Sequence, residues 1–374
     1  MSDFSALVLD GERGFARLVI VCLAAAGVPA HVLALGARSP SRFSRRRASF
    51  HTRESAGDEA YLKAIRRALE KTGADVVLAV KEETVRLLAA HPEALPETVR
   101  VGFVPSVEAF DQVVDKGRLA VFLAGHGLSH PDTLLCTGDD AFEEGISRLV
   151  FPVLLKPVHR RFGERIRRFE TCAALRAFLR THACPPGTFI AQRFVPGFDI
   201  DCSVLCREGQ VLAHTIQQGI ISRRKPFAPP AGIAFVAHAG VLSVTRRLMR
   251  TLRWSGVAHV DLRCDPEGRV WVIEINPRYW GSLLGSLAAG VNFPYLACLS
   301  ALGRSFEPPA YRPVRYVAAG AALRAWMPPR SLRPTLAWRE TEWPHILRDP
   351  LPKMIPFARR VLRFAGSRVR SGSA

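Results

Sequence analysis

Residues 256–282 read GVAHVDLRCDPEGRVWVIEINPRYWGS, and this stretch decides the fold. Two runs in which apolar and polar residues alternate flank the turn residues 265–268, and this pattern is typical of a β-hairpin. A turn at these four residues pairs Cys264 with Arg269 and sets the register of every later pair. The sequence therefore predicts an antiparallel hairpin with a defined set of facing residues.

This register places four polar side chains on one face of the hairpin. Asp261 lies opposite Val272 and His259 opposite Glu274, and side chains alternate with a period of two, so Asn276 shares the face of these acidic residues. Asp261 and Glu274 are then diagonal neighbours, roughly 7–8 Å apart between α-carbons. Two carboxylates and an amide oxygen at this spacing can bind a hard cation. The alternative is an exposed sheet face with ordinary polar residues.

The length and charge of the chain narrow the class of protein. Its 374 residues include 52 basic and 33 acidic ones, a net charge of +19, and 48% of them are hydrophobic. A disordered protein and a fibre are excluded, and about two or three domains are expected. The eight cysteines form no C-x-x-C pair, which indicates free thiols in a reducing cytoplasm rather than a disulfide framework or a zinc site.

Strand and helix patterns alternate over roughly residues 1–105. Such alternation predicts a parallel sheet covered by helices on both faces. The arginine-rich residues 39–53 are expected to form a loop beyond the carboxyl end of a strand, either as an anion-binding lip or as a solvated segment. The expected elements are strands at 6–9, 30–35 and 75–80 and helices at 15–26, 61–72 and 82–90.

Antiparallel strands dominate after about residue 130. A second hairpin turn at Glu208-Gly209 joins two of them, so the opening of the chain is predicted to be α/β and its centre α+β. The expected strands lie at 153–156, 188–194, 200–207, 210–217, 258–264 and 269–275. The last 74 residues differ again, because they hold ten of the 27 prolines and 14 basic against four acidic residues.

The hairpin followed by Glu-Ile-Asn-Pro-Arg resembles the metal-binding end of the ATP-grasp superfamily. The resemblance implies that Asp261, Glu274 and Asn276 hold Mg²⁺, two ions in all, on the phosphates of ATP, with Mn²⁺ as the alternative ion. It also implies an ATP-grasp fold in three parts. These are a Rossmann-like pre-ATP-grasp domain at 1–110, an ATP-grasp domain at 111–305 and a basic, proline-rich C-terminal extension at 306–374.

The resemblance extends upstream in the expected order. Asp115-Lys116 resembles the segment that carries the first nucleotide-contacting lysine, and residues 151–157, FPVLLKP, resemble the strand with the second. Residues 190–199, IAQRFVPGFD, resemble the hinge strand whose backbone reads adenine and whose acidic residue holds ribose. The implied ATP-binding residues are Lys116, Lys156, Gln192, Arg193, Phe194, Val195 and Asp199. Gln192 is equally well explained as a polar strand residue.

One segment departs from the family pattern. A flexible glycine-rich loop should follow Lys156, but residues 158–168 read VHRRFGERIRR, with one glycine and five arginines. Either these arginines replace backbone amides as phosphate clamps, since guanidinium groups bind phosphate bidentately, or closure over the nucleotide is altered.

The resemblance implies an ATP-dependent ligase that joins a carboxylate to an amine through an acyl phosphate and releases ADP and phosphate. Within the superfamily, the chain is similar to carbamoyl-phosphate-synthase-like proteins and carboxylate–amine ligases, including the D-aspartate ligase type. Arg278 is expected to bind the substrate carboxylate or the oxyanion. His259 is expected to act either as a general base or as a spacer beside the metals. The partners are then ATP, a small carboxylate and an amine, whose identities stay open.

Other interpretations remain. One is an ATP-grasp carboxylase or kinase-like enzyme that makes an acyl or carboxy phosphate without an amine acceptor. Another is a non-catalytic basic binding protein, although the basic residues lack the interleaved aromatics of a nucleic-acid surface, so no nucleic-acid partner is expected. Residues 351–366 have the pattern of a basic amphipathic helix, which lies on an anionic membrane or packs on the ligase. The expected location is the cytoplasm, with membrane association through this tail as the alternative, and the oligomeric state is open.

Overall fold

The computed structural model describes residues 2–55, 57–159, 165–182, 184–224, 226–326 and 336–355. The chain divides into two units, each built from separate segments. Unit 1 comprises Met1–Val104, Arg278–Ala310 and Tyr316–Ala374, and unit 2 comprises Pro105–Pro277 and Tyr311–Arg315. The observed first boundary lies close to the predicted one at 110. Residues 278–305, in contrast, belong to unit 1 and not with the rest of the predicted ATP-grasp domain.

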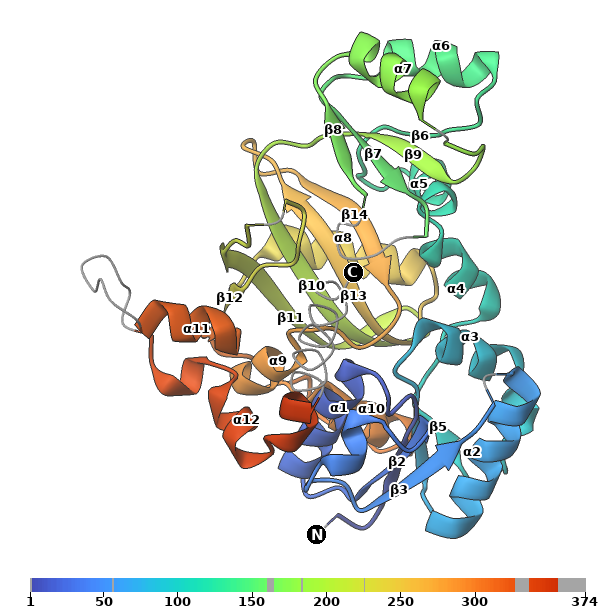
Figure 1. The fold of residues 1–374 in the computed structure, drawn as a ribbon, viewed down its shortest axis with the longest axis vertical. Coiled ribbons are helices and arrows are strands. Elements are labelled where there is room, and N and C mark those ends of the chain that lie inside the picture. The colour runs from blue at the N-terminus through green and yellow to red at the C-terminus, as the bar shows by residue number, and fades with distance from the viewer. Residues whose placement is uncertain are drawn as a thin grey trace, which may run out of the picture. The chain divides into compact units, whose positions relative to one another are not determined.

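Unit 1 contains a five-stranded parallel sheet in the order β3-β2-β1-β4-β5 (Figure 1). The alternating pattern predicted β1, β2, β4 and the helices α1, α2 and α3; the two-residue strand β5 was not predicted, and β3 falls within residues 39–53, which were expected to be a loop. This edge strand carries mostly polar residues, so no apolar alternation marks it. The bounds are β1 Ala6–Val8, α1 Gly14–Ala25, β2 Ala30–Leu35, β3 Ser49–Arg53, α2 Asp58–Thr72, β4 Val76–Leu78, α3 Glu82–Ala90 and β5 Arg100–Val101, with 3-10 turns at Pro40–Phe43 and Pro92–Ala94.

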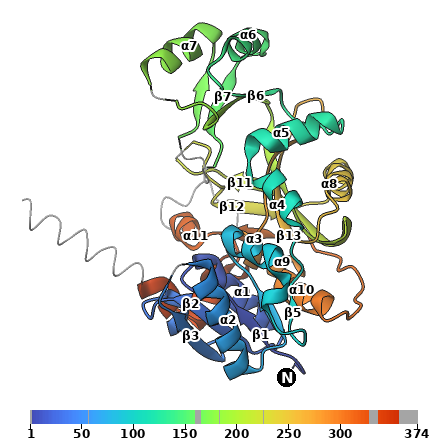
Figure 2. The ribbon, with the colours of Figure 1, turned by 90° about the vertical axis from the view of Figure 1, so that its right-hand side faces the viewer.

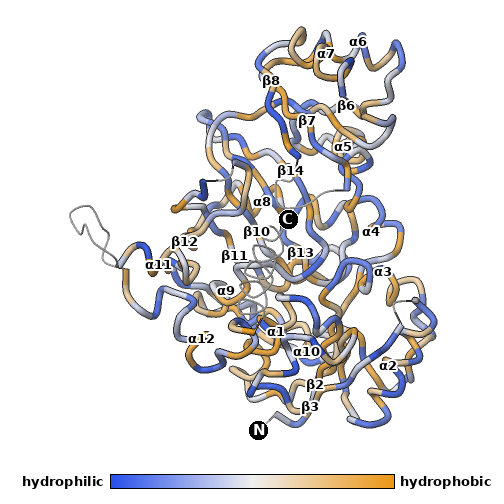
Figure 3. Tube along the Cα trace, viewed as in Figure 1, coloured by the Kyte–Doolittle hydropathy of each residue, from blue (hydrophilic) through white to orange (hydrophobic). Residues whose placement is uncertain are grey.

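Helices cover both faces of this sheet. Leu7 and Leu9 of the central strand pack with the buried residues of α2 and α3. The opposite face meets α1 and α10 (Phe293–Ala301), and α9 (Leu283–Ala289) packs beside them. In Figure 3, α1 and α10 are largely hydrophobic. The Asn292 Nδ2 donates to the backbone oxygen of Cys22 at 2.8 Å, which fixes α10 against α1. Residues after the hairpin thus complete the core of the first domain.

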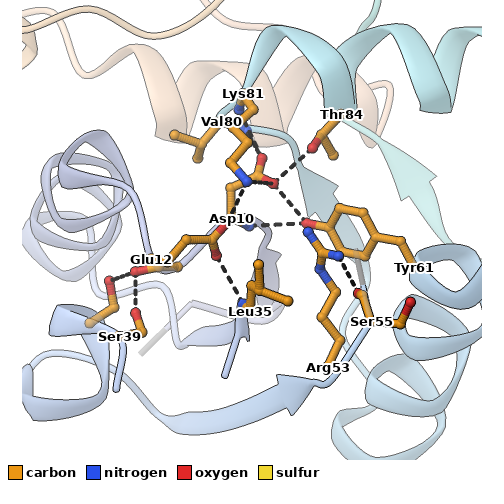
Figure 4. Close-up of polar contacts among 12 residues, drawn as sticks. Asp10, Glu12, Leu35, Ser39, Arg53, Ser55, Tyr61, Val80, Lys81 and Thr84 are labelled. Carbon is orange, nitrogen blue, oxygen red and sulfur yellow. Dashed lines mark hydrogen bonds and ion pairs between the residues drawn. The ribbon is translucent and has the colours of Figure 1, made fainter. Parts of the chain in front are cut away.

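Asp10, fully buried at the end of β1, ties the sheet to its surroundings (Figure 4). Its Oδ2 accepts the backbone N–H groups of Val80 and Lys81 at 3.1 and 2.8 Å. Its Oδ1 accepts the hydroxyls of Tyr61 and Thr84 at 2.9 and 2.7 Å. The residue has a φ of +59°, a conformation that Asp and Asn tolerate better than most side chains. One carboxylate therefore joins β1, α2, α3 and the end of β4.

The described part of the C-terminal extension is held in unit 1 by two carboxylates, of which Glu342 is partly exposed and Asp349 is buried. The Glu342 Oε1 lies 2.8 Å from the Arg17 Nη2. Asp349, which is fully buried, accepts the Ser44 hydroxyl at 2.5 Å and the Arg45 backbone N–H at 3.0 Å. Part of the arginine-rich segment predicted as an anion-binding lip is therefore occupied by the protein's own chain. The elements are β15 Arg315–Val317, α11 Ala319–Trp326, a 3-10 turn at Trp338–Glu340 and α12 Trp343–Arg348. Residues 356–374, with most of the predicted amphipathic helix, lie outside the described residues.

Unit 2 begins with two helices and an antiparallel sheet of four strands in the order β6-β9-β7-β8. Figures 1 and 2 show α6 and α7 together on one side of this sheet, where their apolar residues share a core with Val153, Leu155 and Ala191. The bounds are α4 Val107–Val114, α5 Lys116–Gly125, β6 Thr133–Leu135, α6 Asp140–Arg148, β7 Val153–Pro157, β8 Arg167–Phe169, α7 Cys172–Thr181 and β9 Phe189–Arg193.

A larger antiparallel sheet follows, in the order β14-β13-β10-β11-β12-β15. One face packs against α8, where Cys202, Val204 and Val260 join the buried residues of that helix. Because side chains alternate, their neighbours Asp201, Ser203, His259 and Asp261 project from the other face. The bounds are β10 Phe198–Arg207, β11 Gln210–Ile221, β12 Gly232–Phe235, α8 Ala239–Thr251, β13 Gly256–Cys264 and β14 Val270–Asn276.

Two further features are the state of the cysteines and the length of the apolar helices. All eight cysteines are free thiols. Among the described residues, no single helix has the length and apolar composition needed to cross a membrane. Among these residues, α9 and α10 have this length and composition only when taken together, and they are bent by 87° at the break between them.

Replacing Asp10 by Asn should lower the stability of the protein. The amide nitrogen cannot accept the two donors that face one carboxylate oxygen, while Asn keeps the tolerance for positive φ. We expect the free energy of unfolding to fall by about 2–4 kcal/mol, measured by urea denaturation. Asp58→Asn, on the exposed first turn of α2, is the matched control and should cost less than about 1 kcal/mol. Equal effects of the two changes would contradict the role given to Asp10.

Candidate nucleotide and metal site

Three carboxylates form a row across β10, β13 and β14, on the sheet face opposite α8. Asp261 on β13 pairs with Glu274 on β14 on one side and with Asp201 on β10 on the other. The predicted register, with Asp261 opposite Val272, is wrong. Asp261 and Glu274 are direct neighbours instead of diagonal ones, and the carboxylates are correspondingly closer.

Two local features cause the shift in register. Two hydrogen bonds close the turn between Asp265 and Arg269. The Asp265 N–H donates to the Arg269 carbonyl oxygen at 3.0 Å, and the Arg269 N–H donates to Asp265 Oδ1 at 2.7 Å. Cys264 therefore pairs with Val270. A β-bulge then inserts Ile273 as an extra residue in β14, which moves the pairing one residue further. His259 thus lies opposite Asn276, not opposite Glu274.

The oxygen atoms on this face suit a hard cation. The Asn276 Nδ2 donates to Asp261 Oδ2 at 3.3 Å, so the amide and the carboxylate are already in contact. Asp261 and Glu274 are partly exposed, whereas Asn276 is buried. Carboxylate and amide oxygens are ligands that Mg²⁺ accepts, and the three side chains predicted as metal ligands fit such an ion.

Both predicted nucleotide lysines lie near the carboxylates. Lys116, on the first turn of α5, has its Nζ 3.4 Å from Glu274 Oε1 and donates to the Val158 carbonyl oxygen at 3.3 Å. Lys156 on β7 is buried and donates to Gln192 Oε1 at 2.6 Å. Gln192 is therefore the direct partner of that lysine, and its Nε2 donates in turn to the Thr133 hydroxyl at 2.9 Å.

Burial changes the protonation of Lys156. Desolvation lowers the pKa of this lysine to about 8, Glu274 and Asp199 oppose the decrease, and Lys116 and Arg263 add to it. A cation held in this way is electrostatically costly without an anion beside it. The charge of Lys156 is thus best compensated when a negatively charged ligand is bound.

Two backbone N–H groups of the predicted hinge strand already donate to neighbouring segments. The Arg193 N–H donates to Asp132 O, and the Phe194 N–H to Pro152 O, both at 2.8 Å. Val195 is buried, and within the described residues no hydrogen bond of its backbone N–H is seen. The hinge is therefore left with the backbone near Val195 as its candidate donor for adenine.

The predicted ribose ligand carries a partner that the sequence analysis missed. Asp199 is exposed, and its Oδ1 lies 2.6 Å from Arg263 Nη1. The Arg263 Nη2 also donates to the Gly197 carbonyl oxygen at 2.7 Å. The guanidinium groups of Arg168 and Arg263 stack on the ring of Phe194, at 4.4 and 5.0 Å from its centroid. This cationic and aromatic cluster surrounds the predicted adenine and ribose residues.

The two predicted catalytic residues have different surroundings. Arg278 belongs to unit 1, is buried, and forms an ion pair with Glu82 at 2.8 Å between Nε and Oε1. His259 lies in unit 2, where its Nε2 is 3.4 Å from Asp261 Oδ1 and 3.7 Å from Asp201 Oδ2. His259 is thus a direct neighbour of the carboxylate row, as the shared face of the hairpin predicted.

Asp201 is the acidic residue that sequence reasoning missed. Burial raises the pKa of this carboxyl to about 7; a hydrogen bond from Gln217 Nε2 at 3.0 Å opposes the increase and Asp199 adds to it. Alternation along β10 puts Asp199, Asp201 and Ser203 on one face, and this signal could have found it. The missing information was which strand lies beside β13, because the sequence alone does not show that pairing.

The arginine-rich segment is only partly described. Residues 160–164, with two of the predicted clamp arginines, lie outside the described residues. Arg167 stacks on Phe178, at 4.8 Å from the ring centroid. The Arg168 Nε lies 2.8 Å from Glu170 Oε1, in addition to its contact with Phe194.

Comparisons with known proteins bear on the fold. Residues 187–322 match a family described as ATP-grasp in the biosynthetic pathway with Ter operon. The D-alanine–D-alanine ligase of Chromohalobacter salexigens is 26% identical over 171 residues, which cover 44% of this chain and 54% of that protein. The N5-carboxyaminoimidazole ribonucleotide synthase of Synechococcus elongatus is 27% identical over 190 residues, 49% of this chain and 47% of that protein. The chain thus spans about half the length of the curated relatives it matches.

Solved structures decide the fold. The L-amino acid ligase from Bacillus licheniformis matches with a TM-score of 0.60 at 19% identity, over 84% of this chain and 79% of that one. The N5-carboxyaminoimidazole synthetase from Staphylococcus aureus, complexed with ADP, matches with a TM-score of 0.65 at 14% identity, over 84% and 82%. The chain has the ATP-grasp fold. The fold prediction is therefore confirmed: an ATP-grasp fold with an N-terminal Rossmann-like parallel sheet and antiparallel sheets after it.

The low pKa of Lys156 should make stability depend on pH. Below about pH 8 this lysine is charged in both the folded and the unfolded state, and its burial opposes folding. Between about pH 8 and the ordinary lysine pKa of 10.5, the folded state has lost the proton while the unfolded state keeps it. Stability therefore rises with pH in this window, by up to about 1.4 kcal/mol per pH unit.

The measurement compares the wild type with Lys156→Met, which keeps most of the volume and removes the amine. The difference in unfolding free energy between the two nucleotide-free proteins should change in favour of the wild type as pH rises from about 8 to 10. Lys63→Met, on α2 and exposed, is the control and should show no such trend. A flat difference for Lys156→Met would mean that the lysine is not desolvated.

Proposed function

We propose that this protein is an ATP-dependent, ADP-forming ligase that joins a small carboxylate to an amine. The observation that carries the proposal is the meeting of two lysines with the carboxylate row. Lys116 lies 3.4 Å from Glu274, and the buried Lys156 is influenced electrostatically by both of them. Ammonium groups beside metal-binding oxygens form a site for the phosphates of a nucleotide. The relatives named as ligases support this choice.

The proposed reaction has two steps. A carboxylate oxygen of the first substrate attacks the γ-phosphorus of ATP, the bond to the β-phosphate oxygen breaks, and ADP leaves. The amine nitrogen then attacks the acyl carbon, phosphate leaves, and the amine gives up a proton. Mg²⁺ bound to Asp261, Glu274 and Asn276 would supply charge neutralisation at the phosphates. Lys116 and Lys156 would orient the phosphates and compensate their charge.

The substrate classes are also a proposal. We infer an amino acid or a similar small carboxylate and an amine, which fits the printed names of the D-alanine–D-alanine and L-amino acid ligases. The D-aspartate ligase type is one version of this class. Arg278, held by Glu82, is our candidate for binding a substrate carboxylate. The free thiols agree with a cytoplasmic location, which is part of the same proposal.

A second candidate function is the formation of a carboxy or acyl phosphate without an amine acceptor. The match to carboxyaminoimidazole synthases favours it. The two functions differ in a simple requirement. A ligase needs both a carboxylic acid and an amine for full ATP turnover, whereas the alternative needs only the acid or bicarbonate.

Glu274→Gln should remove the ATP turnover while the protein stays folded. The substitution keeps the shape of the side chain and removes the negative charge next to Lys116 and Asp261. We expect the rate of ADP release to fall by at least about 100-fold, with unchanged circular dichroism. Glu267→Gln, in the exposed turn of the same hairpin, is the matched control and should keep the wild-type rate. Normal turnover in Glu274→Gln would refute the assignment of the metal ligands.

The products should be ADP and inorganic phosphate, in equal amounts with the condensed product. We expect this result when amino acids are supplied in pairs and nucleotides are separated by chromatography. AMP and pyrophosphate would exclude an acyl phosphate. With an ¹⁸O-labelled carboxylate, one labelled oxygen should appear in the released phosphate, because that oxygen bridges carbon and phosphorus in the acyl phosphate. Unlabelled phosphate would contradict the proposed route.

A further inference from the structure

Asp201, His259 and Asp261 bring three metal-binding atoms together beside the proposed magnesium ligands. Their ligand atoms all lie within 4.8 Å of one another. The His259 Nε2 lies 3.4 Å from Asp261 Oδ1 and 3.7 Å from Asp201 Oδ2. Atoms bound at about 2.1 Å to one ion in a tetrahedral or octahedral arrangement are separated by roughly 3.0–3.4 Å. The two distances from His259 are close to these values, and the two carboxylates need at most a small movement to reach them.

A second layer of side chains holds these atoms in place. The His259 Nδ1 is hydrogen-bonded to the hydroxyl of Ser203, which is fully buried, at 2.9 Å. The Gln217 Nε2, also buried, donates to Asp201 Oδ2 at 3.0 Å. In metal sites, the ring nitrogen that does not bind the ion usually donates to such a partner, and ligating carboxylates are themselves hydrogen-bonded. Ser203 and Gln217 have these two roles here.

The arrangement calls for a positive charge at its centre. In the tautomer that donates from Nδ1 to Ser203, the His259 Nε2 has a lone pair directed into the region of two carboxylates. Three electron-pair donors that converge repel one another unless a cation lies between them. Either a metal ion or a proton on His259 Nε2, in the charged ring or in the other neutral tautomer, removes this repulsion.

Asp261 gives its two oxygens to different neighbours. Its Oδ2 accepts from Asn276, whereas its Oδ1 faces His259. The set with His259 contains an imidazole nitrogen, which favours transition metals, while the set with Glu274 and Asn276 offers only oxygen, which suits Mg²⁺. The two sets therefore differ in the ion they select.

We propose that Asp201, His259 and Asp261 form a second cation site, selective for a divalent transition metal such as Mn²⁺ or Zn²⁺ over Mg²⁺. The site shares Asp261 with the magnesium ligands of the proposed function. This shared residue is the only way in which it rests on the proposed function. It requires no nucleotide. Its occupation would place a positive charge next to the carboxylate row before ATP arrives.

The test measures Mn²⁺ binding to the full-length, nucleotide-free protein by electron paramagnetic resonance in a large excess of Mg²⁺. We expect one bound Mn²⁺, with a ¹⁴N coupling from the imidazole in the pulsed experiment. Asp201→Asn and His259→Asn should each weaken binding by at least about 10–100-fold, and His259→Asn should also remove the nitrogen coupling. Ser203→Ala should weaken binding by about 10-fold.

Two controls separate this site from the rest of the molecule. Asp199→Asn makes the same charge change on the same face of β10 and should leave Mn²⁺ binding unchanged. Glu274→Gln should also keep the nucleotide-free Mn²⁺, although it removes ATP turnover. Mn²⁺ binding in a protein without ligase activity would therefore refute the proposed function but not this site. Absent binding, binding without nitrogen coupling, or binding that survives Asp201→Asn would overturn the site, and the first two would favour a proton on His259 Nε2 in place of a metal ion.

Discussion

Repulsion among carboxylates is the constraint on which the rest of unit 2 depends. Asp201, Asp261 and Glu274 form one row across three neighbouring strands. Like charges in directly opposed positions destabilise a sheet, so the row is tolerated only where positive charge is supplied. Lys116 supplies part of it at 3.4 Å from Glu274, and Lys156 adds more from the four-stranded sheet. Ligand binding and the local stability of the sheet are thus consequences of the same electrostatics.

The row stays in place because the other face of the same sheet is packed against α8. The apolar neighbours of the carboxylates pack under α8, so a slip of one residue in any of these strands would bury the charges and expose the core. The cost of such a slip is far larger than the repulsion within the row. The sheet therefore holds three acidic side chains in an arrangement that they would not adopt by themselves.

The sequence predicted the main strands of both units and the first three helices, because apolar periodicity and turn residues are local signals. It failed where the decisive contact is not local. β3 was missed because an edge strand with polar residues shows no alternation, and the hairpin register was wrong because the turn and a bulge at Ile273 each shift the pairing by one residue. Asp261 and Glu274 could be found from one hairpin. Asp201 and Arg263 could not be assigned, because their roles depend on which strand lies beside β13.

The order of the segments in unit 1 has a consequence for biosynthesis. The helices α9 and α10, which pack beside α1, follow the metal-binding hairpin in the chain, although the sheet that they help to cover is made first. During translation, the apolar face of that sheet therefore stays partly uncovered until unit 2 has emerged from the ribosome. Most of unit 2 is one inserted segment, Pro105–Pro277, and only Tyr311–Arg315 joins it later, whereas unit 1 closes last. The nascent chain therefore exposes the partly covered parallel sheet while residues 105–301, about half of the protein, are synthesised.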